Sequence, residues 1–140
     1  MVRQTLPLVA VAGHLVLTAL HGLVHVAIPI LPTGWIAAFA AVSLYGLPLV
    51  GAALIVTGHH RVGAIGLFGA GVASFVFEGA FHFLISNPDH IAYVADHHAL
   101  FSLTAILTTV GNLLLVGAAW FSVQDTGQPE NGISPLSSTE

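Results

Sequence analysis

"GWIAAFAAVSLYGLPLVGAALIVTG", residues 34–58, contains no charged side chain. It exceeds the roughly 20 predominantly apolar residues that a transmembrane helix needs. The same character extends to both sides, because Arg61 is the only formally charged residue between Arg3 and Glu78. Over the whole chain 56% of the residues are hydrophobic and 6% are charged, whereas an ordinary globular domain is about 25% charged. The sequence therefore predicts an integral membrane protein.

Four apolar segments divide the chain, at about residues 5–31, 34–58, 62–86 and 93–122. The stretches between them contain Pro, Gly, Asn and Asp, which favour turns. Short connections place consecutive helices antiparallel, so we expect an all-α fold, a four-transmembrane-helix up-down bundle over residues 1–122. Residues 123–140 are rich in Ser, Gly, Pro and acidic residues, and this composition predicts a disordered tail.

The few basic residues predict the orientation of the bundle. Arg3 precedes the first segment and Arg61 lies between the second and the third, so both fall at the same end. The connections at the other end contain no Lys or Arg. The positive-inside rule then predicts a multi-pass protein of the cell membrane with its N- and C-termini in the cytoplasm.

Composition also excludes several classes of function. The chain has no cysteine, which excludes thiolate metal sites and cysteine nucleophiles. It has no lysine, which excludes Schiff-base chemistry. With Lys+Arg 2, Asp+Glu 6 and a net charge of -4, no basic patch is available to bind a nucleic-acid backbone.

Three of the four segments have polar or small side chains along one helical face, at spacings of three and four residues. These faces are His14, Thr18, His21 and His25 in the first segment; Gly66, Ala70, Ser74, Glu78 and His82 in the third; and His98, Ser102, Ala105, Thr109 and Asn112 in the fourth. A carboxylate inside a membrane span costs several kcal/mol and usually faces a partner or a cavity. Glu78 therefore indicates that these faces meet inside the bundle.

Depth along the helices predicts which of these side chains come together. The outer halves of the three segments contain the candidate ligands His21, His25, Glu78, His82 and His98. We expect them to share one pocket, with His97, Asp96 and His14 as possible additional members. A purely structural polar core, in which each histidine bonds a neighbouring helix, is the alternative interpretation.

Four imidazoles and one carboxylate without sulfur suit a transition metal such as Zn, Fe or Cu. Hard cations such as Mg²⁺ and Ca²⁺ require more oxygen ligands. Two histidines at positions i and i+4 can bind the same ion from one helix. The leading interpretation is thus a His/Glu-lined transition-metal site in the outer half of the bundle, with redox activity as one role that such a site can have.

Two further functions fit the same residues. A b-type haem held by two histidines would make the protein an electron carrier, and the glycines of the third segment would admit the porphyrin. Alternatively, polar groups continue inward from the cluster through Thr18, Ser74 and Thr109 to His14 and Asn112, as in a proton or metal-ion relay. A relay of this size would need a homo-oligomer or a larger respiratory or transport complex. The lipid bilayer is the remaining expected partner.

The His21–His25 spacing resembles the HxxxH motif of the integral-membrane desaturase and hydroxylase superfamily. That superfamily also has an HxxHH motif. Here "ADHH", residues 95–98, lacks the first histidine of that motif, so the sequence does not assign the chain to the superfamily.

Overall fold

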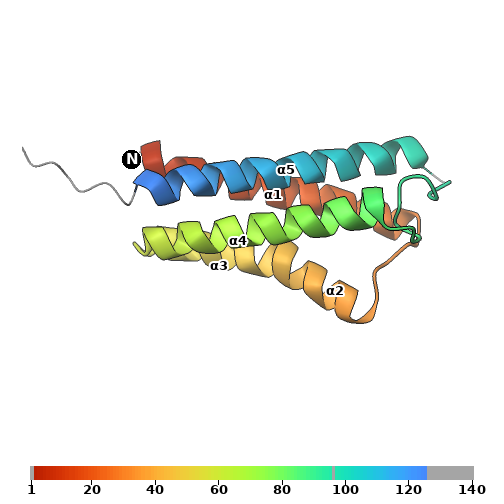
Figure 1. Cartoon of the computed structure of the whole chain (residues 1–140), viewed down its shortest axis with the longest axis horizontal. Coiled ribbons are helices and arrows are strands. Elements are labelled where there is room, and N and C mark those ends of the chain that lie inside the picture. The colour runs from red at the N-terminus through yellow and green to blue at the C-terminus, as the bar shows by residue number, and fades with distance from the viewer. Residues whose placement is uncertain (1, 96, 126–140) are drawn as a thin grey trace, which may run out of the picture.

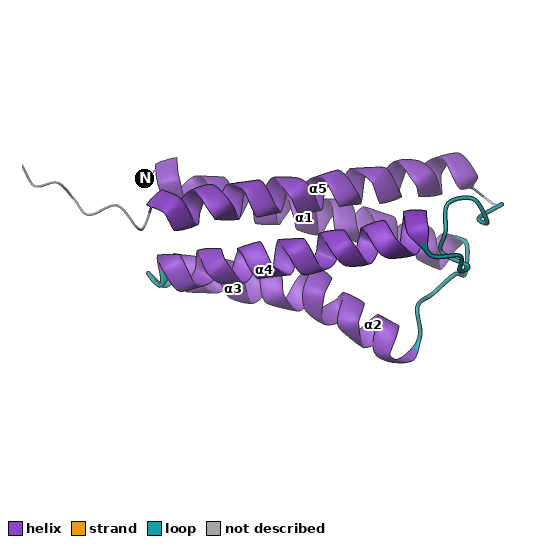
Figure 2. Cartoon of the chain, in the orientation of Figure 1, coloured by secondary structure: helices purple, strands orange, loops and turns teal. Residues whose placement is uncertain are grey.

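The computed structural model describes residues 2–95 and 97–125, and within these ranges the fold is all-helical (Figures 1 and 2). The helical elements in chain order are α1 (Val2–Ala27), α2 (Gly34–Ala40), the π-helix η1 (Ala41–Gly46), α3 (Leu47–Val56), α4 (His60–Gly79), the π-helix η2 (Ala80–Leu84) and α5 (His98–Asp125). The elements α2, η1 and α3 are continuous, as are α4 and η2, so together with α1 and α5 the described residues form four long helices. Consecutive long helices run antiparallel (Figure 1), as the sequence predicted.

Each long helix can cross a membrane. The four spans are Thr5–Ala27, Gly34–Val56, His60–Leu84 and His98–Asp125. Large apolar side chains on their outward faces are exposed, among them Leu23 at 65% and Leu114 at 65%. An aqueous surface does not tolerate a continuous apolar belt of this kind, whereas lipid acyl chains match it. The chain is therefore a multi-pass membrane protein whose outer surface contacts the bilayer.

The last helix differs from the expected segment at both ends. It begins at His98, whereas the apolar pattern suggested about residue 93, and residues 85–95 lie outside the helices at that end of the bundle. It continues to Asp125, beyond the expected end at 122. The expected tail from residue 126 onward lies outside the described residues. The late start of α5 changes the position of His98, as described below.

Small residues let the helices approach closely. At the contact between α3 and α4, a Cβ atom on Gly63 would lie 2.7 Å from the backbone oxygen of Gly51. Leu67 and Leu115 are fully buried nearby and belong to the same apolar cluster. Close packing of this kind is what holds membrane helices together, since no hydrophobic driving force acts between them in lipid.

The π-helix η1 bends the second span. It ends just before Pro48, which has no backbone N–H to donate to the carbonyls of the preceding turn. Two of these carbonyls accept side-chain donors from neighbouring helices: His14 Nε2 bonds Leu44 O at 2.8 Å, and Ser74 Oγ bonds Ser43 O at 3.0 Å. As a result α2 diverges from the bundle (Figure 1) and contributes no buried residue.

Candidate metal centre

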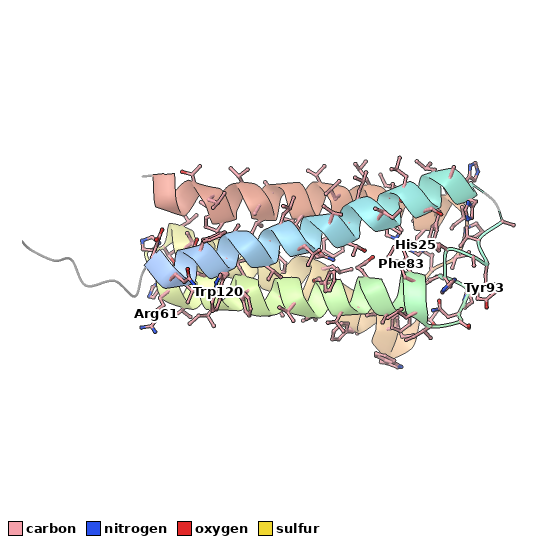
Figure 3. The ribbon with its side chains drawn as sticks, turned by 45° about the horizontal axis from the view of Figure 1, so that its top comes forward. His25, Arg61, Phe83, Tyr93 and Trp120 are labelled. Atoms are coloured by element: carbon pink, nitrogen blue, oxygen red, sulfur yellow. The ribbon has the colours of Figure 1, made fainter. Side chains whose placement is uncertain are left out.

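Three buried histidines meet at the end of the bundle opposite the N-terminus. His21 and His25 lie on α1, and His82 lies in η2. Their exposed fractions are 3%, 8% and 3%. His21 Nε2 lies 3.1 Å from His82 Nε2 and 3.1 Å from His25 Nε2. Figure 3 shows His25 at the same end as Tyr93, whereas Arg61 lies at the opposite end.

Backbone carbonyls determine the protonation of two of these rings. His25 Nδ1 lies 2.7 Å from Ile30 O, and His82 Nδ1 lies 2.8 Å from Asp89 O. A carbonyl oxygen can only accept, so each Nδ1 must carry the proton and donate it. In the neutral rings, Nε2 of His25 and Nε2 of His82 therefore carry no hydrogen, and each has a free lone pair.

The third ring is oriented by a threonine. His21 Nδ1 lies 2.9 Å from Thr104 Oγ1 on α5. The Thr104 hydroxyl donates its own hydrogen to carbonyls of the preceding turn, Leu100 O at 2.9 Å or Phe101 O at 3.0 Å. Because that hydrogen is already used, Thr104 Oγ1 accepts from His21 Nδ1–H. The neutral His21 ring therefore also has its lone pair on Nε2.

Three lone pairs thus converge on one point inside the membrane span. Two unprotonated nitrogens 3.1 Å apart cannot hydrogen-bond each other, since neither carries a hydrogen. This arrangement could hold a cation between the rings, either a bound proton or a metal ion. It also has the usual organisation of a metal site, in which each ligating histidine donates its other ring N–H to a fixed oxygen.

Glu78 contributes a carboxylate to the same point. Its Oε2 lies 3.0 Å from His82 Nε2 and 4.0 Å from His21 Nε2. The Glu78 side chain is 3% exposed, and Oε2 pairs with His82 when that ring carries a proton on Nε2. The carboxylate is therefore available as a fourth electron-pair donor and supplies negative charge against a cation.

Phe101 of α5 closes the other side of the cluster. Its ring is fully buried, and its centroid lies 5.2 Å from His21, 5.2 Å from His25 and 5.4 Å from His82. An aromatic ring against all three imidazoles excludes water from that side. It also restricts the rotamers of the histidines.

Asp89 borders the site from the loop, a position that the sequence did not predict. Besides its carbonyl contact with His82, its Oδ1 lies 4.0 Å from His25 Nδ1. Partial burial raises the pKa of the Asp89 carboxyl above its ordinary value, an effect that His25 and His82 oppose. The proline turn "NPD" shortly after His82 was the available signal, because a tight turn returns the chain toward the helix that it leaves.

The structure does not bring His98 into the cluster. His98 is the first residue of α5 and is exposed. A helix that began near residue 93, as the apolar pattern suggests, would carry His98 into the bundle. The residues of α5 that contact the cluster are Phe101 and Thr104, one and two turns further along.

The other expected members also lie elsewhere. His97 is exposed and has a positive φ of 54° just before α5. Asp96 lies outside the described residues. His14 is buried, but its Nε2 bonds Leu44 O, so it supports the bend in the second span. Of the eight expected residues, the structure brings together His21, His25, Glu78 and His82.

The geometry does not fit a haem between these histidines. Two axial nitrogens, each about 2 Å from iron on opposite faces of a porphyrin, would be roughly 4 Å apart with the macrocycle between them. The observed Nε2 atoms are 3.1 Å apart, and the His21 and His25 ring centroids are 4.6 Å apart. No space for a macrocycle remains between these rings.

No family model, curated protein or solved structure matches the chain significantly. Within the described residues, the multi-pass membrane protein has a buried cluster of His21, His25 and His82 that could hold a metal ion.

Proposed function

We propose that this small membrane protein binds one transition-metal ion between His21, His25, His82 and Glu78. The observation that carries the proposal is the convergence of three Nε2 lone pairs whose Nδ1 atoms are all engaged elsewhere. A bound proton on His82 Nε2 would be donated to Glu78 Oε2, 3.0 Å away, or to His21 Nε2, 3.1 Å away, and in either case His25 Nε2 would have no hydrogen to accept. A metal ion accepts all three and the carboxylate together.

The spacing of the nitrogens supports this choice. For zinc, tetrahedral angles and metal–nitrogen bonds of 2.0–2.1 Å put two ligand nitrogens about 3.4 Å apart. The His21 nitrogen lies 3.1 Å from each of its two neighbours, and the potential ligand atoms of the three histidines all lie within 4.8 Å of one another. Closing the site around an ion needs only small side-chain movements. Imidazole and carboxylate ligands suit Zn, Fe and Cu.

The distribution of basic residues predicts on which side of the membrane the site lies. The cluster lies at the end of the bundle opposite Arg61 (Figure 3). Under the positive-inside rule, the Arg61 end and both termini face the cytoplasm. The metal centre then lies in the outer half of the bilayer of a cell membrane.

An absorption spectrum and elemental analysis of protein purified in mild detergent test the proposal. We expect about one equivalent of Zn, Fe or Cu per chain and no Soret band. A Soret band at stoichiometric intensity would show that the protein binds haem and would overturn the proposal of a single metal ion. Protein that binds none of these metals even after dialysis against them would leave a shared proton as the cation in the cluster.

A proton relay is a second candidate, favoured by unsatisfied polar atoms deeper in the bundle. Thr18 Oγ1, His14 Nδ1 and both side-chain polar atoms of Asn112 are buried without a hydrogen bond among the described residues. Buried polar atoms in a membrane span are costly unless internal water satisfies them. Such water would connect the cluster with the other end of the bundle. Proton flux in proteoliposomes that Asn112→Leu abolishes would support this function, whereas equal flux in empty vesicles would exclude it.

Homo-oligomerisation or membership of a larger complex also stays a prediction. The exposed faces of α4 offer small residues for it: a Cβ atom on Gly66 or Gly69 would meet no other group within 4 Å. Close helix contacts in lipid use such positions.

A further inference from the structure

A cavity of about 210 Å³ lies directly beside the histidine cluster. Its polar end is formed by His21, Glu78 and His82, and its walls by apolar side chains that include Leu44, Phe77 and Phe81. A cavity with one polar end and apolar walls suits a molecule that has a polar head group and an apolar chain.

The bend in the second span creates this cavity. Ala40 of α2 and Leu44 and Tyr45 of η1 form one wall, and Gly22 of α1 lies across from them. A Cβ atom on Gly22 would lie 3.4 Å from the Tyr45 hydroxyl, so the absence of a side chain there keeps the space open. A straight second span would bring α2 against the bundle and close it.

The cavity opens toward lipid. Two of its lining residues, Leu31 and Tyr45, are 57% and 36% exposed. Tyr45 lies halfway along the span Gly34–Val56, at the depth of the acyl chains. A molecule entering past Tyr45 would therefore come from the bilayer and not from water.

The size of the cavity limits what it holds. Pockets that enclose a whole small molecule have volumes of about 300–1,000 Å³. A cavity of about 210 Å³ fits the head group and first carbons of a longer chain, whose remainder stays between the lipids. The chemistry of the polar end selects the head group, because a metal ion of this type binds oxygen donors.

We propose that the cavity binds a single-chain membrane amphiphile whose oxygen-bearing head group, a carboxylate or a hydroxyl, reaches the metal ion. This inference rests on the proposed metal centre for the head group and on the cavity alone for the chain. It assigns the substrate or ligand class of the site: a long-chain fatty acid or alcohol drawn from the bilayer.

Photo-crosslinking tests the chain, using palmitate with a diazirine near its carboxyl and the full-length protein in phosphatidylcholine nanodiscs. We expect labelling of the peptides around residues 40–45 and 77–81, with competition by unlabelled palmitate. Ala40→Phe should fill the cavity and lose this labelling. The matched control is Ala38→Phe on the same short helix, which is exposed and outside the cavity, and it should label as the unmodified protein does.

Cobalt absorption tests the head group in the same nanodiscs. With Co²⁺ bound, palmitate or hexadecanol should shift the visible d–d bands, whereas hexadecane should not, and comparing the first two separates carboxylate from hydroxyl. Cobalt binding without a lipid-induced shift would overturn the amphiphile while leaving the metal centre intact. Absence of cobalt binding would overturn the metal centre. Uniform labelling of all lipid-facing helices, unchanged in Ala40→Phe, would refute the cavity as a binding site.

Discussion

His21 and His82 are separated by 61 positions in the chain, yet their Nε2 atoms lie 3.1 Å apart. Neither nitrogen carries a hydrogen in the neutral ring, because Thr104 and the Asp89 carbonyl occupy the two Nδ1 atoms. In the neutral form these two nitrogens face each other as electron-pair donors inside a membrane span, whereas a proton on His82 Nε2 would pair with Glu78 Oε2, 3.0 Å away. A bound cation turns this repulsion into a stabilising interaction.

Removing one of the converging nitrogens should abolish tight metal binding. His82→Ala takes away one imidazole ligand and the ion-pair partner of Glu78. We expect a loss of affinity well beyond the roughly 10–100-fold cost of disturbing a group that only supports a ligand. Isothermal titration of the metal-free protein in detergent measures it. The control is His98→Ala, because His98 is exposed; equal losses in the two variants would contradict the ligand assignment.

Thr104→Val should weaken metal binding without touching a ligand. Valine has nearly the same shape but cannot accept the His21 Nδ1–H bond, so the ring loses its orientation. We expect affinity to fall by about 10–100-fold, measured by competition with a chelator. Thr109→Val is the matched control, since the Thr109 hydroxyl bonds only Ala105 O of its own helix. If Thr104→Val binds as tightly as Thr109→Val does, the threonine does not orient the site.

Glu78→Gln separates a charged ligand from a hydrogen-bonding neighbour. The amide keeps the size of the side chain but removes the negative charge that lies 3.0 Å from His82 Nε2. If the carboxylate balances the charge of a metal ion, the Glu78→Gln protein should bind the metal more weakly. The melting temperature of its metal-loaded form should also be lower than that of the unmodified protein. Its melting temperature without metal should fall less, or rise, because an ionised carboxylate is costly in a membrane span. A thermal-shift assay in both forms reads this out. The opposite order would show that Glu78 serves the metal-free fold.

The glycine contact between α3 and α4 predicts the behaviour of the bundle itself. Gly63→Ala would place a Cβ atom 2.7 Å from the Gly51 backbone oxygen and 3.0 Å from the Ile55 backbone nitrogen. Backbone atoms cannot move aside cheaply, so we expect a loss of about 1–3 kcal/mol in the free energy of unfolding. Gly66→Ala, on the same helix with no group within 4 Å of the added Cβ, should be neutral or slightly stabilising. Unfolding in detergent mixtures compares the two, and a Gly63→Ala protein as stable as Gly66→Ala would refute the close contact.

Local spacing in the sequence was enough to predict the four-helix fold and the two pairs of side chains that meet in the cluster. Long uncharged stretches separated by turns predicted the four spans. The pairs His21–His25 and Glu78–His82 are each four residues apart, so their side chains share a helical face wherever the helix ends are. In an up-down bundle the first and third spans run in the same direction, so both pairs come to the same end of the bundle.

The remainder of the site depended on features without a local pattern. The predicted position of His98 differs from the structure because its depth depends on where α5 begins. An apolar stretch does not determine the start of a helix to within one turn. The positions of Thr104 and Phe101 depend on the rotation of α5 about its axis, and the position of the Asp89 carbonyl depends on the path of residues 85–95. Periodicity encodes neither. Pro48 indicated a bend in the second span, but the sequence does not predict the cavity that this bend opens.

X-ray absorption at the zinc edge of zinc-loaded protein tests the central claim most directly, because it counts imidazole ligands through their multiple scattering. We predict three imidazole nitrogens at about 2.0–2.1 Å and at least one oxygen, falling to two imidazoles in His82→Ala. A shell without imidazole scattering, or one that His82→Ala leaves unchanged, would contradict the account.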